Sequence, residues 1–380
     1  MIGFETHVDA LDALKTKGRY RVLVPRMGKD FASNDYLGLA NSEDLNKAAI
    51  AALERGVALG AGASRLLRGN DPEHEALEKE AATFFGTQKA LFFGGGFVAN
   101  AAIFSTLPRN GDLIVYDELI HASAHDGMRL GRAQAVAFEH NNVTHAETVI
   151  NEWRAKGGTG RIWLAFETVY SMEGDIAPIR DIVALAQAHD AVLVADEAHA
   201  TGVLGVQGRG LLYAYEGQAD IITLHTCGKA LGVSGALVCG ATSLIDTLIN
   251  RARGFIFSTA PSPLTAALVR AALNTLQQIP SPSDALAKRV AHAHREAVQK
   301  CGLATLQTQI IPVIIGDDKQ TMVVASRMQA HGFDVRGIRP PSVPRGTARL
   351  RISITLNASP TEISDMFSVL AEELENVPNV

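Results

Sequence analysis

The stretch TLHTCGKALGVSG, residues 223–235, contains a single lysine, Lys229, among small residues and shortly after the apolar run at 221–224. The run predicts a strand, and Lys229 follows it in a tight loop with little access to water. Desolvation lowers the pKa of a lysine, and the neutral amine is the form that reacts with an aldehyde. Taken alone, the stretch also suits an ordinary surface lysine in a glycine-rich loop.

A second apolar run precedes this stretch and helps to decide between the two interpretations. Residues 191–199, AVLVADEAH, end abruptly in Asp196, Glu197 and His199. Such a run is typical of a buried parallel strand, and open α/β sheets bind ligands at the carboxyl ends of their strands. We therefore expect Asp196, His199 and Lys229 to meet at one sheet edge. This trio suits pyridoxal phosphate, since the carboxylate pairs with the ring nitrogen and the lysine holds the aldehyde.

Predicted strands and helices alternate from about residue 73 to residue 240. The alternation indicates an α/β domain with a mostly parallel sheet and helices on both faces. The expected strands lie at 90–93, 113–116, 135–138, 162–166, 191–195, 221–224 and 236–239. Further helices are expected at 43–55, 242–252, 262–277 and 284–300.

The two ends of the chain have different patterns. After about residue 304, strands at 310–315 and 349–354 and helices at 320–331 and 360–375 indicate a small α+β domain. Apolar residues at helical spacing predict a helix over 1–17, and alternation over 19–32 predicts a hairpin that turns near 27–29. We expect three parts: an N-terminal segment over 1–42, a large domain over 43–280, and a C-terminal small domain over 281–380.

The glycine-rich motif at 94–99 supports a competing interpretation. It fits the pattern G-x-G-x-x-A, and Asp117 ends the next strand, as in the dinucleotide-binding unit of an NAD-dependent dehydrogenase. However, this unit would start some ninety residues into the chain, and it gives the lysine and carboxylate described above no role. In the pyridoxal interpretation, the amides of Gly96 and Phe97 at a helix N-terminus bind the cofactor phosphate.

Several motifs, in this order, resemble those of the α-oxoamine synthases, a branch of the fold-type I pyridoxal-phosphate enzymes. They are FASNDYLGLA at 31–40, GAGASRLLRGNDPEHEALE at 60–78, FGGGFVAN at 93–100, SMEGDIAP at 171–178, DEAHATGVLG at 196–205, HTCGKALGVSGA at 225–236, FSTAPSP at 257–263 and IRPPSVPRGTARLRISIT at 338–355. The resemblance covers about residues 31–356 and is strongest to members that join L-alanine to a pimeloyl thioester in biotin synthesis.

This resemblance implies a decarboxylative condensation that releases CO2 and either CoA or an acyl-carrier protein. It implies the fold of the fold-type I transferases and a homodimer with shared active sites. Siblings that use glycine or serine are the alternatives within the family: aminolevulinate synthase, 2-amino-3-ketobutyrate ligase and serine palmitoyltransferase. IRPPSVP favours the alanine-using members.

The resemblance also assigns roles around the cofactor ring. Lys229 holds the aldehyde and removes the Cα proton of the amino acid, while Asp196 keeps the ring nitrogen protonated. His199 and Ser171 contact the ring hydroxyl, and His121 stacks on the pyridine ring.

Further roles concern the phosphate and the substrates. Thr226 and Thr259 donate hydroxyls to the phosphate, the second one from the partner subunit. Asn34 and Arg351 contact the carboxylate of the amino acid, with Arg349 as the alternative arginine.

The remaining basic residues leave choices open. Either Arg19 or Arg21 lines the substrate channel, and we select Arg21 for the candidate site. Arg65 and Arg68 either contact an acidic acyl-CoA or belong to a solvated basic loop.

Other function classes lack support in the sequence. The 380 residues carry a net charge of −5, which gives no nucleic-acid footprint. Three scattered cysteines suit neither a disulfide framework nor a zinc site; His121 and His125 have metal-ligand spacing without the H-E-x-x-H pattern. DEAH at 196–199 lacks the phosphate loop of a helicase. No apolar run has membrane-spanning length, and the acidic N-terminus is no signal peptide, so we expect a cytoplasmic protein that binds no metal.

Overall fold

The computed structural model describes residues 4–215, 217, 220–278, 280–304 and 307–376. The chain divides into two compact units. Unit 1 contains the chain up to Asn34, the segment Met172–Gly174 and the chain from Lys288; unit 2 contains Asp35–Ser171 and Asp175–Ala287. The units thus change over at 34/35 and 287/288, where the sequence predicted boundaries at 42/43 and 280/281.

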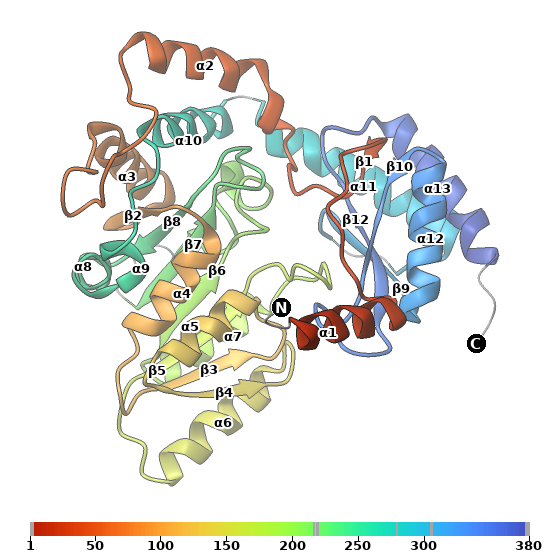
Figure 1. Ribbon diagram of the computed structural model, residues 1–380. Coiled ribbons are helices and arrows are strands. Elements are labelled where there is room, and N and C mark those ends of the chain that lie inside the picture. Colours follow the sequence, from red (N-terminus) through yellow and green to blue (C-terminus); the bar gives the residue numbers. More distant parts are fainter. Residues whose placement is uncertain (1–3, 216, 218–219, 279, 305–306, 377–380) are drawn as a thin grey trace. The chain divides into compact units, whose positions relative to one another are not determined.

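A seven-stranded sheet forms the centre of unit 2 (Figure 1), in the order β2-β8-β7-β6-β5-β3-β4. Its strands are β2 (Lys89–Phe93), β3 (Leu113–Asp117), β4 (Gln134–Phe138), β5 (Ile162–Glu167), β6 (Val192–Asp196), β7 (Ile221–Thr226) and β8 (Ala236–Gly240). Neighbours are parallel except at β8, which runs antiparallel to both β2 and β7. This confirms the predicted strands and the mostly parallel α/β sheet.

Residues of alternating parity in these strands face two separate cores. Leu113 and Val115 belong to one core, whereas Ile114 between them belongs to the other, because successive side chains of a strand point to opposite faces. The first core includes residues of α6 (Val143–Ala155) and α7 (Ile179–Ala188). Both faces of the sheet are therefore covered by helices, as the sequence predicted.

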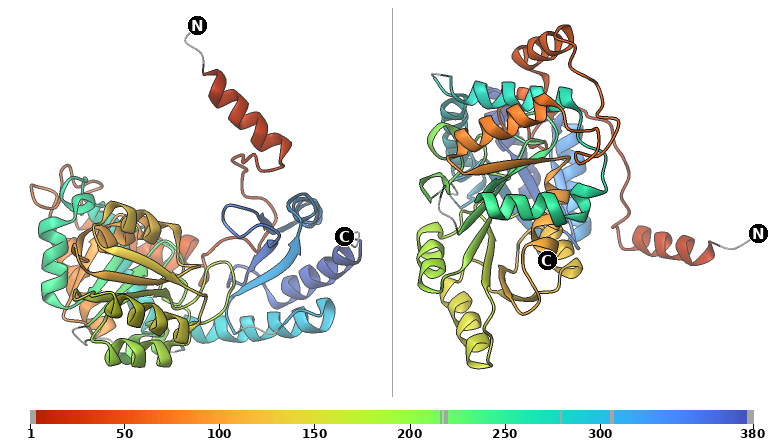
Figure 2. Two further views of the ribbon diagram at one scale, coloured as in Figure 1. Left: turned by 90° about the horizontal axis from the view of Figure 1, so that it is seen from below. Right: turned by 90° about the vertical axis from the view of Figure 1, so that its left-hand side faces the viewer.

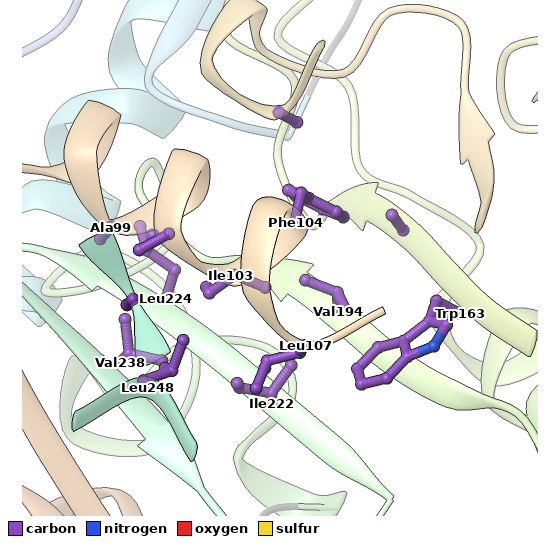
Figure 3. Packing of buried hydrophobic residues seen from close by; sticks show 14 of the residues in the cluster. Ala99, Ile103, Phe104, Leu107, Trp163, Val194, Ile222, Leu224, Val238 and Leu248 are labelled. Atoms are coloured by element: carbon purple, nitrogen blue, oxygen red, sulfur yellow. The ribbon is translucent and has the colours of Figure 1, made fainter. Parts of the chain in front are cut away.

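The second core lies under α4 (Gly96–Thr106), α5 (Ala122–Leu130), α8 (Thr242–Arg251) and α9 (Arg253–Ile256). In Figure 3, Ile103 of α4 points into this core, and Leu107, directly after the helix, lies close to Ile222 of β7. Burying a side chain of this size stabilises the fold by about 1.5–3 kcal/mol. This packing fixes the first turn of α4 beside the carboxyl end of β7.

The remaining elements of unit 2 lie beside the sheet. They are η1 (Leu39–Asn41), α2 (Glu43–Glu54), α3 (Pro72–Phe85), η2 (Val206–Gly208), η3 (Tyr213–Tyr215) and α10 (Pro263–Leu276). Helices α3 and α10 each begin with a polar cap followed by proline at the first helical position. Arg270 of α10 bonds to Glu73 and Glu80 of α3 and fixes the two helices together.

Unit 1 contains a three-stranded antiparallel sheet in the order β11-β12-β9 and a two-stranded parallel pair of β1 and β10. Its strands are β1 (Lys29–Asp30), β9 (Ile310–Gly316), β10 (Phe333–Asp334), β11 (Arg336–Ile338) and β12 (Ala348–Ser353). Its helices are α1 (Glu5–Thr16), α12 (Asp318–Ala330) and α13 (Pro360–Glu375), and α11 (Pro282–Cys301) enters it from unit 2. The α+β pattern predicted after residue 304 is confirmed.

The hairpin predicted over 19–32 is wrong. Residues 19–28 contain no strand, and β1 pairs instead with β10, some three hundred residues later in the chain. Val22 and Leu23 are largely exposed, so their alternation has no apolar face to cover. At Gly28 (φ +75°) an added Cβ would lie 2.4 Å from the carbonyl oxygen of Gly332, which shows how close the new partner approaches.

Helix α1 confirms the helix predicted at the N-terminus. It contains no buried residue, and Figure 2 shows it extending away from the β-strands of unit 1. Its apolar residues Val8, Leu11 and Leu14 are exposed. The apolar spacing of the sequence predicts that this helix packs on the rest of the protein or on a second subunit, and this stays a prediction.

Candidate active site

Lys229 lies in a tight turn between the antiparallel strands β7 and β8. The amide of Cys227 donates to the carbonyl of Gly235 (2.8 Å), and the amide of Val233 donates to the carbonyl of Cys227 (2.9 Å). Gly232 (φ +66°) closes the turn against the chain at Ala40, where an added Cβ would come within 2.5 Å of the amide nitrogen. The turn is therefore rigid, and it presents Lys229 at the carboxyl end of β7.

The amine of Lys229 is hydrogen-bonded to a buried imidazole. Its Nζ lies 2.7 Å from Nε2 of His199, and Nδ1 of the same ring lies 2.6 Å from the hydroxyl of Tyr36. Both His199 and Tyr36 are buried. The three residues thus form a hydrogen-bonded row, and a proton can pass between amine and imidazole within it.

Burial rules out a second nucleophile in this turn. The side chain of Cys227 is fully buried, and burial raises the pKa of its thiol. A neutral buried thiol is a small apolar side chain and not a nucleophile.

Asp196 is fixed at the end of β6 by donors from two directions. The Nδ2 of Asn100, on α4, donates to its Oδ2 (2.7 Å), and the amide of Ala198 donates to its Oδ1 (2.9 Å). The same Asn100 amide group donates to the hydroxyl of Ser123 (3.1 Å). These bonds fix the orientation of the carboxylate.

His121 caps the N-terminus of α5. Its Nδ1 lies 2.7 Å from the hydroxyl of Ser123 and accepts from the amide of the same residue (3.3 Å). Burial lowers the pKa of His121; the charge of Asp196 opposes this, while Lys229 and His125 lower the pKa further. His121 is therefore a neutral ring beside the amine and the carboxylate, as stacking on another ring requires.

The first turn of α4 forms a further border of this site. The cap residue of α4 is Gly95, so no side chain caps the first amides of the helix. An added Cβ at Gly95 would meet no atom within 4 Å. At Gly96, the nearest atom to an added Cβ is Oγ1 of Thr226, at 3.5 Å. The ring of Phe97 lies edge-on to that of His121, 6.4 Å between centroids. Helix amides and a hydroxyl beside open space are what a phosphate needs.

Unit 2 thus brings together seven of the predicted residues: Gly96, Phe97, His121, Asp196, His199, Thr226 and Lys229. They supply an amine, a carboxylate for a ring nitrogen, a flat neutral ring and amides for a phosphate. This set of groups fits pyridoxal phosphate.

The dinucleotide interpretation of the glycine motif does not fit the sheet. In a dinucleotide-binding unit the glycine loop follows a central parallel strand. Here it follows β2, which lies at the edge of the sheet and runs antiparallel to β8. The carboxylate of Asp117 is fully buried and already bonded to His140 and Asn141.

Ser171 and Thr259 occupy loops of unit 2. Ser171 is half-buried in the loop after β5, next to an isolated antiparallel bridge between Val169 and Ile176. Thr259 is exposed between α9 and α10; the carbonyl of Pro261, two residues later, lies 2.8 Å from Nε2 of His74. Their contacts with the cofactor stay predictions.

The two arginines of β12 lie on one face of that strand in unit 1 and differ in their partners. Arg349 donates through NH1 to Oε1 of Glu173 (3.0 Å) and to the carbonyl of Met172 (3.1 Å), so its charge is balanced. The NH1 of Arg351 donates to the hydroxyl of Ser353 (2.8 Å). The choice of Arg351 over Arg349 for a substrate carboxylate stays a prediction. Asn34 is the last residue of unit 1, directly before Asp35 of unit 2.

The other candidate arginines also differ in their partners. In unit 1, Arg19 forms an ion pair with Asp318 (2.7 Å), while Arg21 contacts the hydroxyl of Ser342 (3.5 Å); both border a cavity of about 570 Å³. In unit 2, Arg65 donates to both oxygens of Glu78 (2.8 and 2.9 Å). Arg65 is thus already matched by a carboxylate.

The part of the chain that the structure describes contains neither a candidate metal site nor a candidate membrane-spanning helix. That part contains no group of three or more His, Cys, Asp or Glu side chains arranged to hold a metal ion. None of its helices combines the length and apolar composition needed to cross a bilayer. His125, the second histidine of the metal-like pair, packs its ring edge-on against Tyr116.

Three site residues were missed from the sequence: Tyr36, Asn100 and Ser123. Asn100 is an amide in an otherwise apolar helical stretch, and this signal could have pointed to it. Tyr36 belongs to the motif at 31–40, and Ser123 follows His121 by two residues, but His199 and Asn100, with which they bond, come from distant segments.

The chain is similar to known proteins in sequence and in fold. The aminotransferase class I and II family matches residues 28–365. An 8-amino-7-oxononanoate synthase of Geobacter sulfurreducens is 40% identical over 95% of this chain and 96% of its own length. A serine palmitoyltransferase structure from S. paucimobilis with bound PLP has a TM-score of 0.88, with 27% identity over 98% of both chains. The 8-amino-7-oxononanoate synthase structure from Francisella tularensis has a TM-score of 0.77, with 26% identity over 92% of this chain and 98% of that one.

Proposed function

Since the chain belongs to the aminotransferase class I and II family, we propose that it joins L-alanine to a pimeloyl thioester. The products are 8-amino-7-oxononanoate, CO2 and the free thiol of CoA or of an acyl-carrier protein. The protein is a pyridoxal-phosphate-dependent acyltransferase. The choice of substrates rests on relatives of 35–40% identity that carry the name 8-amino-7-oxononanoate synthase.

The observation that carries the proposal is the 2.7 Å contact between Nζ of Lys229 and Nε2 of His199, close to an oriented Asp196. Pyridoxal phosphate, when bound, supplies an electron sink for the Cα of the amino acid. Lys229 holds the cofactor aldehyde and then acts as the base that takes the Cα proton. His199 receives or returns a proton at Nζ, and Tyr36 fixes the ring of His199.

The other residues bind and orient. Asp196 keeps the ring nitrogen protonated, and the neutral face of His121 packs on the ring. The amides of Gly96 and Phe97, with the hydroxyl of Thr226, bind the phosphate.

Three residues complete these contacts. Ser171 contacts the ring hydroxyl. Arg351 and Asn34 hold the carboxylate of alanine, so that the bond to be broken stays in one orientation.

The carbon–carbon bond forms between Cα of alanine and the carbonyl carbon of the thioester. The thiolate leaves and takes up a proton, and the original carboxyl group of alanine departs as CO2. One proton from Cα is removed in the first half of the reaction, and one is returned to the same carbon after CO2 is lost. Lys229 is placed to carry out both transfers.

A homodimer with shared active sites belongs to the proposal. Several large apolar side chains of unit 2 near the glycine-rich segments are exposed: Leu66, Leu67, Phe97 and Phe257. A partner subunit that covered these side chains would remove their apolar surface from water. Thr259, which is exposed two residues after Phe257, would then contact the phosphate in the partner's site.

The first experiment is a visible absorption spectrum of the full chain loaded with pyridoxal phosphate, with L-alanine, glycine or L-serine added separately. We expect a band that changes at the lowest concentration with alanine, and thiol release when pimeloyl-CoA follows. A band that changes with glycine instead would move the substrate to a sibling. A protein that gives no band with added pyridoxal phosphate would contradict the cofactor.

Serine palmitoyltransferase activity is the second candidate. It is favoured by one observation, the higher TM-score to serine palmitoyltransferase structures (0.88) than to the Francisella enzyme (0.77). Thiol release from palmitoyl-CoA with serine, and none from pimeloyl-CoA with alanine, would select it.

A further inference from the structure

A cluster of charged residues lies at the same sheet edge as the candidate site but outside it. His140 follows β4 by two residues, and its ring is placed between two carboxylates. Nδ1 lies 3.0 Å from Oδ1 of Asp117, at the end of β3, and Nε2 lies 2.9 Å from Oδ2 of Asp175. The side chain of Asp117 is fully buried, and those of His140 and Asp175 are 21% and 32% exposed.

This geometry favours a charged imidazole. A neutral imidazole has one donor and one acceptor nitrogen, whereas both nitrogens of His140 face carboxylate oxygens, which only accept. Nε2 also lies 3.2 Å from the side-chain nitrogen of Asn141, which donates to the same oxygen of Asp175. Burial alone lowers the pKa of His140, but hydrogen bonds and charges of Asp117 and Asp175 outweigh it and raise the pKa to about 10. Asn141 reinforces the cluster, since its backbone amide donates to Asp117 (2.8 Å) and its side chain donates to Asp175 (2.9 Å).

Each carboxylate is bonded to a loop that carries a residue of the candidate site: Asp117 lies directly before one loop, and Asp175 lies within the other. Residues 118–121, the His121 loop, start directly after Asp117, whose carboxylate accepts from the amide of Leu119 (2.9 Å). Residues 168–178, the Ser171 loop, contain Asp175, whose carbonyl accepts from the amide of Tyr170 (3.0 Å).

We propose that His140 is a positioning residue that ties the His121 loop to the Ser171 loop through Asp117 and Asp175. The two loops bring groups to opposite parts of the same ligand, a ring-stacking imidazole and a hydroxyl for the ring oxygen. A fixed distance between them defines the slot for the pyridine ring. The inference rests on the proposed function only for its cofactor, pyridoxal phosphate.

The test compares three variants of the full chain with the wild type. In His140→Gln both ties are lost, because glutamine carries no charge and cannot donate to both carboxylates as imidazolium does. In Asp175→Asn the bond to Asp117 remains, and only the tie to the Ser171 loop is weakened, because the neutral amide oxygen is a weaker acceptor for the imidazolium than a carboxylate. His145→Gln is the matched control: this histidine is close in sequence and accepts from the amide of Glu139 (3.1 Å), but it faces neither loop carboxylate.

Two readouts separate positioning from plain stability. Hydrogen exchange of the cofactor-free protein, measured on peptides covering the two loops, should become about tenfold faster in both loops for His140→Gln and only in the Ser171 loop for Asp175→Asn. Titration with pyridoxal phosphate, followed by visible circular dichroism, should show a dissociation constant about tenfold higher for His140→Gln, as for other residues that orient a binding group. The control should match the wild type in both readouts.

Unchanged cofactor affinity and unchanged exchange in either loop of His140→Gln would overturn the proposal. Equal acceleration over the whole sheet would do the same, since it indicates a purely structural role. If His140→Gln does not fold, hydrogen exchange of Asp175→Asn tests the proposal instead: faster exchange in the Ser171 loop alone would support it, and unchanged exchange there would overturn it. A wild type that binds pyridoxal phosphate but makes no product would contradict the proposed function and leave this test intact.

Discussion

Two histidines at one edge of the seven-stranded sheet have opposite surroundings. His199 follows β6, is buried, and contacts a phenol and an amine. His140 follows β4, is partly exposed, and contacts two carboxylates. The partners therefore decide the role: a ring between an amine and a phenol, which both carry protons, can exchange protons with them, whereas a ring between two anions is held in its charged form. The first suits chemistry, and the second suits holding loops in place.

The largest loss of turnover is expected from replacing Lys229, the first residue of the hydrogen-bonded row of Lys229, His199 and Tyr36. Lys229→Ala removes the base and the group that holds the aldehyde, so turnover should fall by about 10³-fold or more. Far-ultraviolet circular dichroism should stay unchanged, because the side chain adds little to the core. An active Lys229→Ala variant would show that the region around His199 is not the site of the chemistry, and its contrast with the region around His140 would be lost.

A smaller loss is expected at the carboxylate that orients the cofactor ring. Asp196→Asn keeps the shape and the bond from Asn100 but loses the negative charge, so turnover should fall by about 10²-fold. The visible spectrum with alanine should change as well. Wild-type turnover at saturating alanine would show that this charge is not needed.

The charged cluster should be visible as a pH-dependent stability. The pKa of His140 is raised from 6.5 to about 10, so its contribution is complete below pH 6.5 and is lost as the pH rises towards 10. His140→Gln should lower the free energy of urea unfolding by about 2 kcal/mol at pH 6, less than for a fully buried pair because the ring is partly exposed. The difference from wild type should shrink between pH 7 and pH 10; a constant difference over that range speaks against the imidazolium.

The smallest loss of turnover is expected from replacing Tyr36, the last residue of the hydrogen-bonded row. Tyr36→Phe removes the hydroxyl 2.6 Å from Nδ1 of His199 but keeps the buried ring. Loss of one such hydrogen bond is worth about 1 kcal/mol, or a turnover reduced by about fivefold. The pH profile of turnover should shift, since the partner of the imidazole changes. If the turnover of Tyr36→Phe and its pH profile equal those of the wild type, only Lys229 and His199 of the row contribute to the reaction.

Much of unit 2 could be predicted because its strands are short apolar runs between loops, and such runs leave a periodic signal. The strands predicted from 90–93 to 236–239 are all present, often one residue longer at an end. The motif-based residues around Lys229 also came together in the structure. The hairpin over 19–32 failed because alternation alone does not show whether a face is buried, and β1 pairs with a strand from the far end of the chain.

The sequence by itself determined the α/β sheet, the position of Lys229 after β7 and that of Asp196 at the end of β6, because these depend on local apolar runs and the residues that end them. The tertiary structure alone decided which partners those groups acquire. Tyr36 reaches His199 across 163 positions, Asn100 reaches Asp196 across 96, and Arg349 reaches Glu173 across 176. A hydrogen bond depends on distances of about 3 Å, and only the packing of distant segments sets such distances.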